Sequence, residues 1–404
     1  MRILHTSDFH LGKNLEGFSR MDEQQEFLED FSQLVIDKKI DLVIIAGDIY
    51  DSSNPPARAE NMFYELLKKI SNDGKTMTLV ISGNHDNPQR LVAAAPLAME
   101  HGIVMVATPK TVIPPGKYGM NEICDSGEGY IEAYINGEKI VILTVPYPSE
   151  KRLDEVLYDI EESDEEKAMC YSHRLKGLFD NLSQHYKDDT INIATSHLFA
   201  MGSEETGSER SIQLGGSFIV NCDCFPKKAQ YVALGHIHKP MSVPGTMGKV
   251  RYAGSPLQYN KNEINFTKGC YILDIHCGEE PDIETVNFKT YKPIEIWKCS
   301  SVNDAIDKCR ENGNKNCWVY LEIETDSFIS QEHIKEMKSY KDDILEIRPI
   351  IKSEDQEDNE DQCFNLSEKS FKELFSQFYI KNRKVEPEDE VIQEALAIME
   401  EEEI

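Results

Sequence analysis

The sequence predicts a layered α/β fold with sheets flanked by helices, followed by a small α/β cap and a C-terminal helical pair. In the first half of the chain, short β-branched runs alternate with stretches of helical periodicity, which is typical of an α/β sheet covered by helices. In the second half, a short strand–helix cycle precedes an acidic stretch and two amphipathic segments. A chain of 404 residues is long enough for about two or three domains.

The expected elements of the first half follow this alternation. Strands are expected at 2–6, 41–46, 76–81, 102–106, 139–145, 191–195 and 231–234, and helices at 21–38 and 58–71. From 250 to 275 the pattern turns to strands without helices, which indicates a second, more antiparallel part of the same layered domain. We assign residues 1–285 to this domain.

The next segment is expected to form a separate cap. Within residues 286–350, strands are expected at 291–298, 318–324 and 344–350, with helices at 303–312 and after Ser330. Residues 351–365 are rich in acidic and amide side chains, which predicts a solvated linker.

Two amphipathic helices are expected in residues 366–404. The first, which Ser367 could cap, carries an apolar stripe at i, i+3, i+4 and i+7 that is formed by Phe371, Leu374, Phe375 and Phe378. The second follows Pro387, and its apolar side is formed by Val391, Ile392, Ala395, Leu396 and Met399. Such a pair either packs back on the first domain or docks on a partner helix, and the sequence leaves both alternatives open.

The composition is that of a globular protein outside the membrane. Hydrophobic residues make up 40% and charged residues 28% of the chain, and no apolar run approaches the roughly 18 residues of a membrane span. The N-terminus lacks the pattern of a secretory signal, so we expect a cytoplasmic protein. The ten cysteines are scattered with one close pair, Cys222 and Cys224, which favours free thiols over a structural zinc site.

The charge balance argues against a protein that coats DNA by itself. The net charge is −29, whereas neutralising phosphates requires clustered Lys and Arg. Residues 351–404 hold 17 Asp or Glu against 6 Lys or Arg, so the acid is concentrated at the C-terminal end. A local basic groove elsewhere, or a partner that supplies the DNA-binding surface, is compatible with this balance.

Five short polar clusters follow expected strands, which is where ligands gather in open α/β sheets. They are Asp8-Phe9-His10, Gly47-Asp48, Gly83-Asn84-His85-Asp86, Ser196-His197 and Gly235-His236-Ile237-His238. In an extended segment the two members of each Asp-x-His or His-x-His pair point to the same side, so each pair can face one metal centre.

The donor types in these clusters indicate the metal. Carboxylate and amide oxygens together with imidazoles, without thiolate, suit Mn²⁺ or Fe²⁺ better than structural zinc. The carboxylate of Asp48 can bridge two ions about 3.5–4 Å apart, the separation that clamps the attacking and leaving oxygens in a displacement at phosphorus. Each cluster alone is equally explained by a loop cap or a turn, but five in this order are not. We predict a dinuclear site formed by Asp8, His10, Asp48, Asn84, His197, His236 and His238.

This ordered set resembles the calcineurin-like metallophosphoesterases. The resemblance implies a sandwich of two mixed sheets flanked by helices, and two divalent ions, with Mn²⁺ the expected metal. It also implies that one ion is held by Asp8, His10, Asp48 and His238, and the other by Asp48, Asn84, His197 and His236.

Further stretches resemble the SbcD family of nuclease subunits, which act with SbcC-type coiled-coil ATPases. They are residues 5–12 (HTSDFHLG), 46–51 (AGDIYD), 207–210 (GSER) and 252–259 (YAGSPLQY), and the resemblance covers most of the chain. It implies a 3′-to-5′ exonuclease on double-stranded DNA that is also an endonuclease on single strands and hairpins, in DNA repair, replication and recombination. It further implies a homodimer within a heterotetramer.

Several residues beside the ligands receive weaker or separate roles. His85 is the expected general acid on the leaving oxygen, with Asp86 available to orient it. Arg210, Arg251 and Ser255 are weak candidates for substrate contact, since an ion pair with a nearby Glu or a β-turn explains them equally well. The apolar stripe of the first tail helix is a weak candidate for partner binding.

Two other functions are compatible with the same metal residues. A stand-alone phosphoesterase acting on proteins or small phosphate esters would share the site, but it has no evident use for a helical pair beyond an acidic linker. A non-catalytic scaffold in a repair complex is disfavoured, because it has no need of all seven ligands.

Overall fold

The computed structural model describes residues 1–155, 163–209, 219–326, 328–351, 371–383, 385–387 and 389–402. The chain forms two compact units, Met1–Leu15 with Ser19–Tyr291, and Glu16–Phe18 with Lys292–Ile404. The boundary expected between 285 and 286 falls inside strand β16 (Asp282–Asn287), and the units divide after Tyr291 instead. Apart from Ile351, the expected linker lies outside the described residues, as does Ser367.

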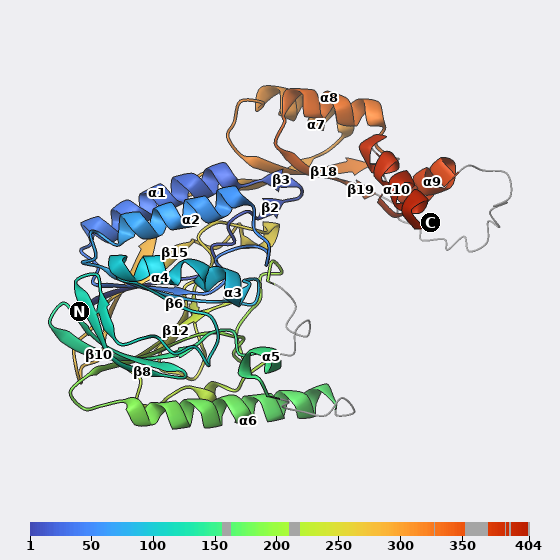
Figure 1. Cartoon of the computed structure of the whole chain (residues 1–404). Coiled ribbons are helices and arrows are strands. Elements are labelled where there is room, and N and C mark those ends of the chain that lie inside the picture. The colour runs from blue at the N-terminus through green and yellow to red at the C-terminus, as the bar shows by residue number, and fades with distance from the viewer. Residues whose placement is uncertain are drawn as a thin grey trace. The chain divides into compact units, whose positions relative to one another are not determined.

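Two mixed sheets form the first unit (Figure 1). The first sheet has the order β16, β15 (Gly269–Asp274), β1 (Arg2–Thr6), β4 (Leu42–Ala46), β5 (Met77–Ile81) and β6 (Ile103–Val106). The second has the order β13 (Met241–Ser242), β14 (Val250–Tyr252), β12 (Tyr231–Gly235), β11 (Ile191–His197), β10 (Glu138–Val145), β9 (Tyr130–Ile135), β8 (Asn121–Gly127) and β7 (Gly116–Tyr118). Strands β2 (Asn14–Leu15) and β3 (Phe18–Ser19) form a small ribbon. The layered α/β fold expected from the sequence is confirmed.

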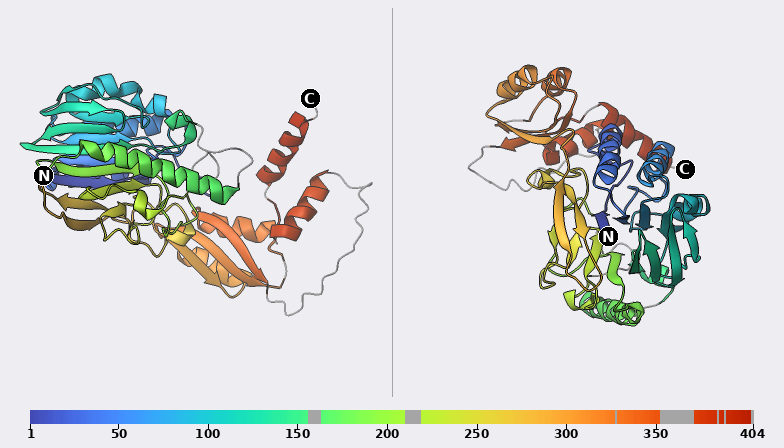
Figure 2. Two further views of the ribbon diagram at one scale, coloured as in Figure 1. Left: turned by 90° about the horizontal axis from the view of Figure 1, so that it is seen from below. Right: turned by 90° about the vertical axis from the view of Figure 1, so that its left-hand side faces the viewer.

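Alternating side chains along the strands build three apolar layers. Ile44 of β4 and Ile142 of β10 lie in the core between the two sheets. Val43 points the other way and packs with helices α1 (Met21–Asp37) and α2 (Ala57–Ile70), whereas Val141 packs with α6 (Asp164–Leu182). Successive strand residues face opposite sides of a sheet, so each strand contributes to two layers. Figure 2 shows α6 on the outer face of the second sheet from two further directions.

Shorter helical turns connect the strands of the first unit. They are α3 (Pro88–Leu91), η1 (Val92–Ala94), α4 (Ala95–Ala98), η2 (Met99–His101), α5 (Glu150–Leu153), η3 (Ser183–His185), η4 (Cys222–Cys224) and η5 (Lys261–Glu263). Asn87 begins α3 by accepting hydrogen bonds from the main-chain N–H groups of Gln89 and Arg90, which ends the loop that follows β5.

The expectation that residues 250–275 form a second, more antiparallel part is wrong. Strand β14 lies parallel to β12 in the second sheet, whereas β15 lies antiparallel to β1 in the first. The segment therefore passes from one sheet to the other. Helix α6 and the antiparallel strands β7, β8 and β9 are further elements that the sequence pattern did not predict.

The second unit is built on a small parallel sheet. Its strands are β17 (Ile294–Cys299), β18 (Trp318–Thr325) and β19 (Ile344–Ile351), and its helices are α7 (Val302–Glu311) and α8 (Gln331–Tyr340). Ser301 and Ser330 cap these helices through their side chains. This is the strand–helix cycle expected for the cap.

Two further helices of the second unit complete the described chain, α9 (Phe371–Arg383) and α10 (Asp389–Glu402). The turn between them contacts the cap: Val385 bridges to Ile329, and the Gln331 main-chain N–H donates to Glu386 Oε2 at 2.9 Å. On α9, Phe378 is 66% exposed. The side chain of Phe375 is half-buried, whereas the side chains of Phe371 and Leu374 lie outside the described part of the structure.

Two chemical features complete the description of the fold. Within the ranges that the structure describes, no helix is both long and apolar enough to cross a bilayer. The cysteines in these ranges carry free thiols.

Candidate metal centre

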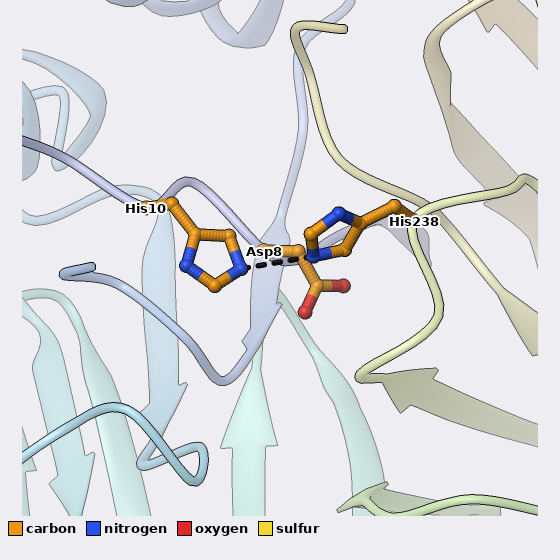
Figure 3. Close-up of side chains that lie close together, drawn as sticks. All are labelled: Asp8, His10 and His238. Carbon is orange, nitrogen blue, oxygen red and sulfur yellow. Dashed lines mark hydrogen bonds between the residues drawn. The ribbon is translucent and has the colours of Figure 1, made fainter. Parts of the chain in front are cut away.

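The residues predicted as ligands converge at one edge of the sandwich. Asp8, His10 and His238 offer ligand atoms within 4.8 Å of one another, and all three are buried. Figure 3 shows the His10 and His238 rings turned toward each other beside the Asp8 carboxylate. The Nε2 atoms of the two rings form a hydrogen bond of 2.9 Å.

A second group of candidate ligands includes Asp48 itself. Asp48, His197 and His236 also offer ligand atoms within 4.8 Å of one another. The Oδ1 atom of Asn84 lies 2.9 Å from His197 Nε2 and 3.3 Å from His236 Nδ1. Asp48 Oδ2 lies 3.4 Å from His197 Nε2 and 3.6 Å from His10 Nε2, so this carboxylate is between the two groups.

The sheet topology explains this convergence. Strands β1, β4 and β5 are parallel in the first sheet, and β11 and β12 are parallel in the second. Each ligand lies at or just after the carboxyl end of one of these strands, where parallel strands bring their following loops together. Four ligands have left-handed backbone angles, with φ of 55° at Asp8, 45° at His10, 50° at Asp48 and 108° at His236. Such conformations cost free energy and gather at functional sites.

Glycines allow the ligand loops to approach closely. A Cβ atom on Gly83 would lie 2.1 Å from Asp48 Oδ1, and one on Gly47 would lie 2.4 Å from His197 Nδ1. A Cβ atom on Gly235 would lie 1.9 Å from the Ala46 main-chain oxygen. These distances exclude any side chain at the three positions while the ligands keep their places.

Two of the histidines are held by a hydrogen bond at Nδ1 and turn Nε2 inward. His197 Nδ1 donates to the Ala46 main-chain oxygen at 2.8 Å, and His238 Nδ1 lies 2.6 Å from Ser208 Oγ. His10 Nδ1 lies 3.5 Å from Asp51 Oδ1 and makes no hydrogen bond. A metal-binding histidine is commonly oriented in this way by a partner of its second nitrogen.

Burial and the Asp48 carboxylate set the charges of the cluster. Burial lowers the pKa of His10 and of His236 to about 3, so both rings are neutral at pH 7. Burial acts in the same direction on His197, but the Asp48 carboxylate overcomes it and raises the pKa of His197 to about 9. Burial would raise the pKa of Asp48, yet His197 and His85 bring that pKa well below its ordinary value.

The donor atoms fit a divalent metal ion. His236 Nε2 is buried and has no hydrogen-bond partner. Unpaired buried polar atoms are rare in native proteins and call for an explanation such as an ion. The combination of carboxylate, amide and imidazole donors suits Mn²⁺ or Fe²⁺.

The expected role of Asp86 in orienting His85 is wrong. The Asp86 carboxylate accepts hydrogen bonds from the main-chain N–H groups of Gly83, Ile49 and Tyr50, at 2.8, 3.3 and 3.0 Å. It therefore ties the loop after β5 to the loop after β4. The ring of His85 is held instead by the main-chain oxygen of Asp51, 2.6 Å from Nδ1, and its Nε2 lies 4.0 Å from Asp48 Oδ2.

The weak substrate candidates do not lie open at the site. Ser255 is fully buried and accepts a hydrogen bond from Lys268 Nζ, so the expectation of substrate contact is wrong. Arg251 donates to the Gly248 main-chain oxygen and stacks over the Tyr271 ring. Arg210 lies outside the described residues.

Arg152 is a further residue of the site that the sequence did not predict. Its guanidinium donates to the main-chain oxygens of Gly83 and Asp86, both at 2.8 Å, and lies over the ring of Tyr147. Arg152 therefore fixes the loop that carries Asn84 and His85. No motif signals this role, because Arg152 lies in a helix some 66 residues beyond Asp86.

Comparison with known proteins gives matches over both units. Residues 1–240 match the calcineurin-like phosphoesterases, and residues 290–383 match the type 5 capsule protein repressor C-terminal domain. The SbcD subunit of the SbcCD nuclease of Bacillus subtilis (strain 168) is 36% identical over 385 residues, which cover 94% of this chain and 93% of that protein. The SbcD subunit of Rhodobacter capsulatus is 31% identical over 70% of this chain and 68% of its own length. The SbcD subunit of Escherichia coli (strain K12) is 27% identical over 93% and 92%.

Proposed function

This chain belongs to the calcineurin-like phosphoesterases and, within them, to the SbcD subunits of the SbcCD nucleases, and from that membership we propose that it hydrolyses DNA phosphodiesters at a two-metal centre. The proposed activities are 3′-to-5′ exonuclease on double strands and endonuclease on single strands and hairpins, in DNA repair, replication and recombination. Mn²⁺ is the proposed metal. The observation that carries the proposal is the position of Asp48 between two groups of buried ligand atoms.

The seven ligand residues divide into two proposed sets. Asp8, His10, Asp48 and His238 would hold one ion, and Asp48, Asn84, His197 and His236 would hold the other. Asp48 belongs to the second group of ligand atoms and its Oδ2 lies 3.6 Å from His10 Nε2 of the first. When bound, the two ions would neutralise charge on the phosphoryl oxygens and activate the attacking water.

His85 is the proposed general acid. The main-chain oxygen of Asp51 can only accept a hydrogen bond, so His85 Nδ1 must carry a hydrogen. The unpaired Nε2 is then the atom that takes up and releases a proton, and it faces the cluster. From there it would protonate the leaving 3′ oxygen of the scissile phosphodiester, which stays on the strand that precedes the cut.

A cleavage assay with Mn²⁺ tests this proposal. The full chain is given blunt duplex, hairpin and single-stranded DNA, and bis(4-nitrophenyl) phosphate, with and without an SbcC-type ATPase and ATP. Phosphorothioates at the 3′ ends of the duplex should block degradation, whereas the same linkages at the 5′ ends should not. Hydrolysis of the small ester alone, under every condition, would favour a stand-alone phosphoesterase and refute the nuclease.

We also propose that an SbcC-type ATPase binds the tail helices and that the complex is a heterotetramer containing two copies of this chain. The large exposed face of Phe378 on α9 supports this, since exposed aromatic side chains on an amphipathic helix suit a partner helix. Phe378→Glu should abolish co-purification with the ATPase and leave ester hydrolysis unchanged. Phe328→Glu, at a 50% exposed phenylalanine outside the tail, is the matched control. Light scattering of the wild-type complex would give its mass, and a single copy per complex would refute the dimer.

A further inference from the structure

A buried group of side chains lies behind the metal ligand His238. Its Nδ1 atom is 2.6 Å from Ser208 Oγ, and Ser208 is in turn hydrogen-bonded to Glu263 Oε1. Glu263 pairs with Lys268, whose Nζ lies 2.6 Å from Oε2. The side chains of Glu263, Lys268 and His238 are 0%, 6% and 1% exposed. Four residues from three separate segments therefore form one hydrogen-bonded chain.

The direction of each hydrogen bond in this chain is determined by its acceptor. Glu263 is surrounded by donors, since Thr206 Oγ1 reaches Oε1 at 3.0 Å, and the Tyr259 main-chain N–H reaches Oε2 at 3.1 Å. A carboxylate among such donors is ionised and can only accept. The Ser208 hydroxyl must therefore donate to Glu263. Its oxygen is then left to accept, which requires the hydrogen of His238 to be on Nδ1.

The segment that contains Ser208 also contacts the backbone of His238. Glu209 Oε1 accepts from the main-chain N–H of His238 at 3.0 Å, and Oε2 accepts from that of Gly207 at 2.8 Å. Lys268 Nζ also donates to the main-chain oxygen of His238 at 2.9 Å. Both the ring and the backbone of His238 are thus held by this group of residues.

We propose that Ser208 and Glu263 are positioning residues for the ion held by His238, an inference that rests on the proposed metal site. They fix the imidazole hydrogen on Nδ1 and keep the Nε2 lone pair directed at the cluster. Stability alone is a poor explanation of the group, because a buried ion pair is often no more stabilising than apolar residues of similar volume. Orienting partners of metal-binding histidines typically change metal affinity by about 10–100-fold when they are removed.

The proposal requires that the two ions respond differently. Glu263 and Ser208 contact His238 and none of Asn84, His197 or His236 in the contacts of the described residues. Loss of the hydroxyl or of the carboxylate should therefore weaken one ion by about 10–100-fold and leave the other unchanged. A purely structural role would instead weaken both ions together or neither.

Calorimetric titration of the metal-free full chain with Mn²⁺ tests this without DNA. The variants are Ser208→Ala, Glu263→Gln, and Glu263→Gln combined with Lys268→Met, which avoids an unpaired buried lysine if the single change prevents folding. Ser208→Thr keeps the hydroxyl and should restore the affinity. Ser71→Ala, at a buried hydroxyl that donates to the Lys68 main-chain oxygen, and Asp343→Asn, at an ion pair with buried Lys341, are matched controls.

Two outcomes would overturn the proposal. One is wild-type affinity for both ions in Ser208→Ala and in the folded Glu263 variant, and the other is an equal loss of both ions. The nuclease proposal fails separately, since a wild-type chain that binds two ions and cuts no DNA would leave the positioning role intact. Conversely, full DNA cleavage with unchanged affinities in these variants would refute only the positioning role.

Discussion

His85 Nδ1 lies 2.6 Å from the main-chain oxygen of Asp51, so the ring of His85 is oriented by the backbone of the loop after β4. The main-chain N–H of His85 also donates to Asp48 Oδ1 at 2.9 Å. Both contacts connect the loop of the proposed acid to the loop of the proposed bridging ligand. No side chain is needed to orient the His85 ring.

The His85→Ala variant should separate proton donation from metal binding. Both ions should bind as in the wild type, while DNA cleavage falls by about 10²–10⁴-fold. Hydrolysis of bis(4-nitrophenyl) phosphate should fall much less, because nitrophenolate leaves without a proton. The measurements are turnover on both substrates and calorimetric binding of Mn²⁺. His101→Ala, at an exposed histidine, is the control. Equal losses on the two substrates would show that His85 is not the acid.

The Gly83→Ala variant should disturb the metal centre through a single methyl group. The added Cβ atom would lie 2.1 Å from Asp48 Oδ1 and 2.3 Å from the Asp48 main-chain nitrogen, so the Asp48 loop must move. We expect at least about tenfold weaker Mn²⁺ binding, on the scale seen when a metal site loses its supporting contacts.

Gly177→Ala is the matched control for this change. Gly177 lies in α6, and nothing lies within 4 Å of the position of its added Cβ atom. The free energy of unfolding should rise by about 0.5–1 kcal/mol, because alanine is favoured over glycine in a helix. Unchanged metal binding in Gly83→Ala would mean that the loop accommodates the methyl group and that the close approach is not required.

The Arg152→Lys variant should loosen the loop that carries Asn84 and His85. Lysine keeps the charge but cannot reach both main-chain oxygens of Gly83 and Asp86 as the planar guanidinium does. We expect slower turnover, by up to about 10²-fold if the loop shifts by about 1 Å, and faster amide hydrogen exchange at residues 83–87. Arg174→Lys is the control, since Arg174 pairs with Glu155. Unaltered exchange at 83–87 would contradict the anchoring role.

The position of the candidate metal centre could be predicted because its residues directly follow strands that are recognisable in the sequence. Asp8, Asp48 and His197 each lie at or after the end of a buried strand, and parallel strands bring such ends together. Their role as metal ligands stays a prediction. The predicted role of Asp86 is wrong because adjacency to His85 in the sequence does not imply contact: the turn directs the two side chains to different partners.

What the sequence could not predict depends on contacts between distant segments. Ser208 and Glu263 are 55 residues apart, and their contact exists only because the segments before β12 and after β14 meet behind His238. Helix α6 was missed although Tyr171, Leu175 and Phe179 follow one another at four-residue spacing and are buried against the second sheet. Most residues of α6 are polar, so the helix shows only a narrow apolar stripe in the sequence.

His5 should make the first unit sensitive to acid. Its side chain is fully buried, with Nε2 donating to the Leu234 main-chain oxygen and Nδ1 accepting from the Tyr231 hydroxyl. Burial lowers the pKa of His5 from its ordinary 6.5 to about 3, although the Leu234 contact opposes this. Above pH 6.5 the ring is neutral in the folded and unfolded chain, so it adds no pH dependence there. Between pH 6.5 and about 3 only the unfolded chain takes up the proton, so stability is lost as the pH falls.

The His5→Gln variant isolates this contribution. Each pH unit in that window should cost the wild type about 1.4 kcal/mol more of its free energy of unfolding than the variant. Urea unfolding should be followed by circular dichroism in the presence of a chelator, because Trp297 and Trp318 both lie in the second unit and their fluorescence reports on that unit. If the wild type and His5→Gln lose stability in parallel from pH 6.5 to 4, the buried ring is not the group that takes up the proton on unfolding.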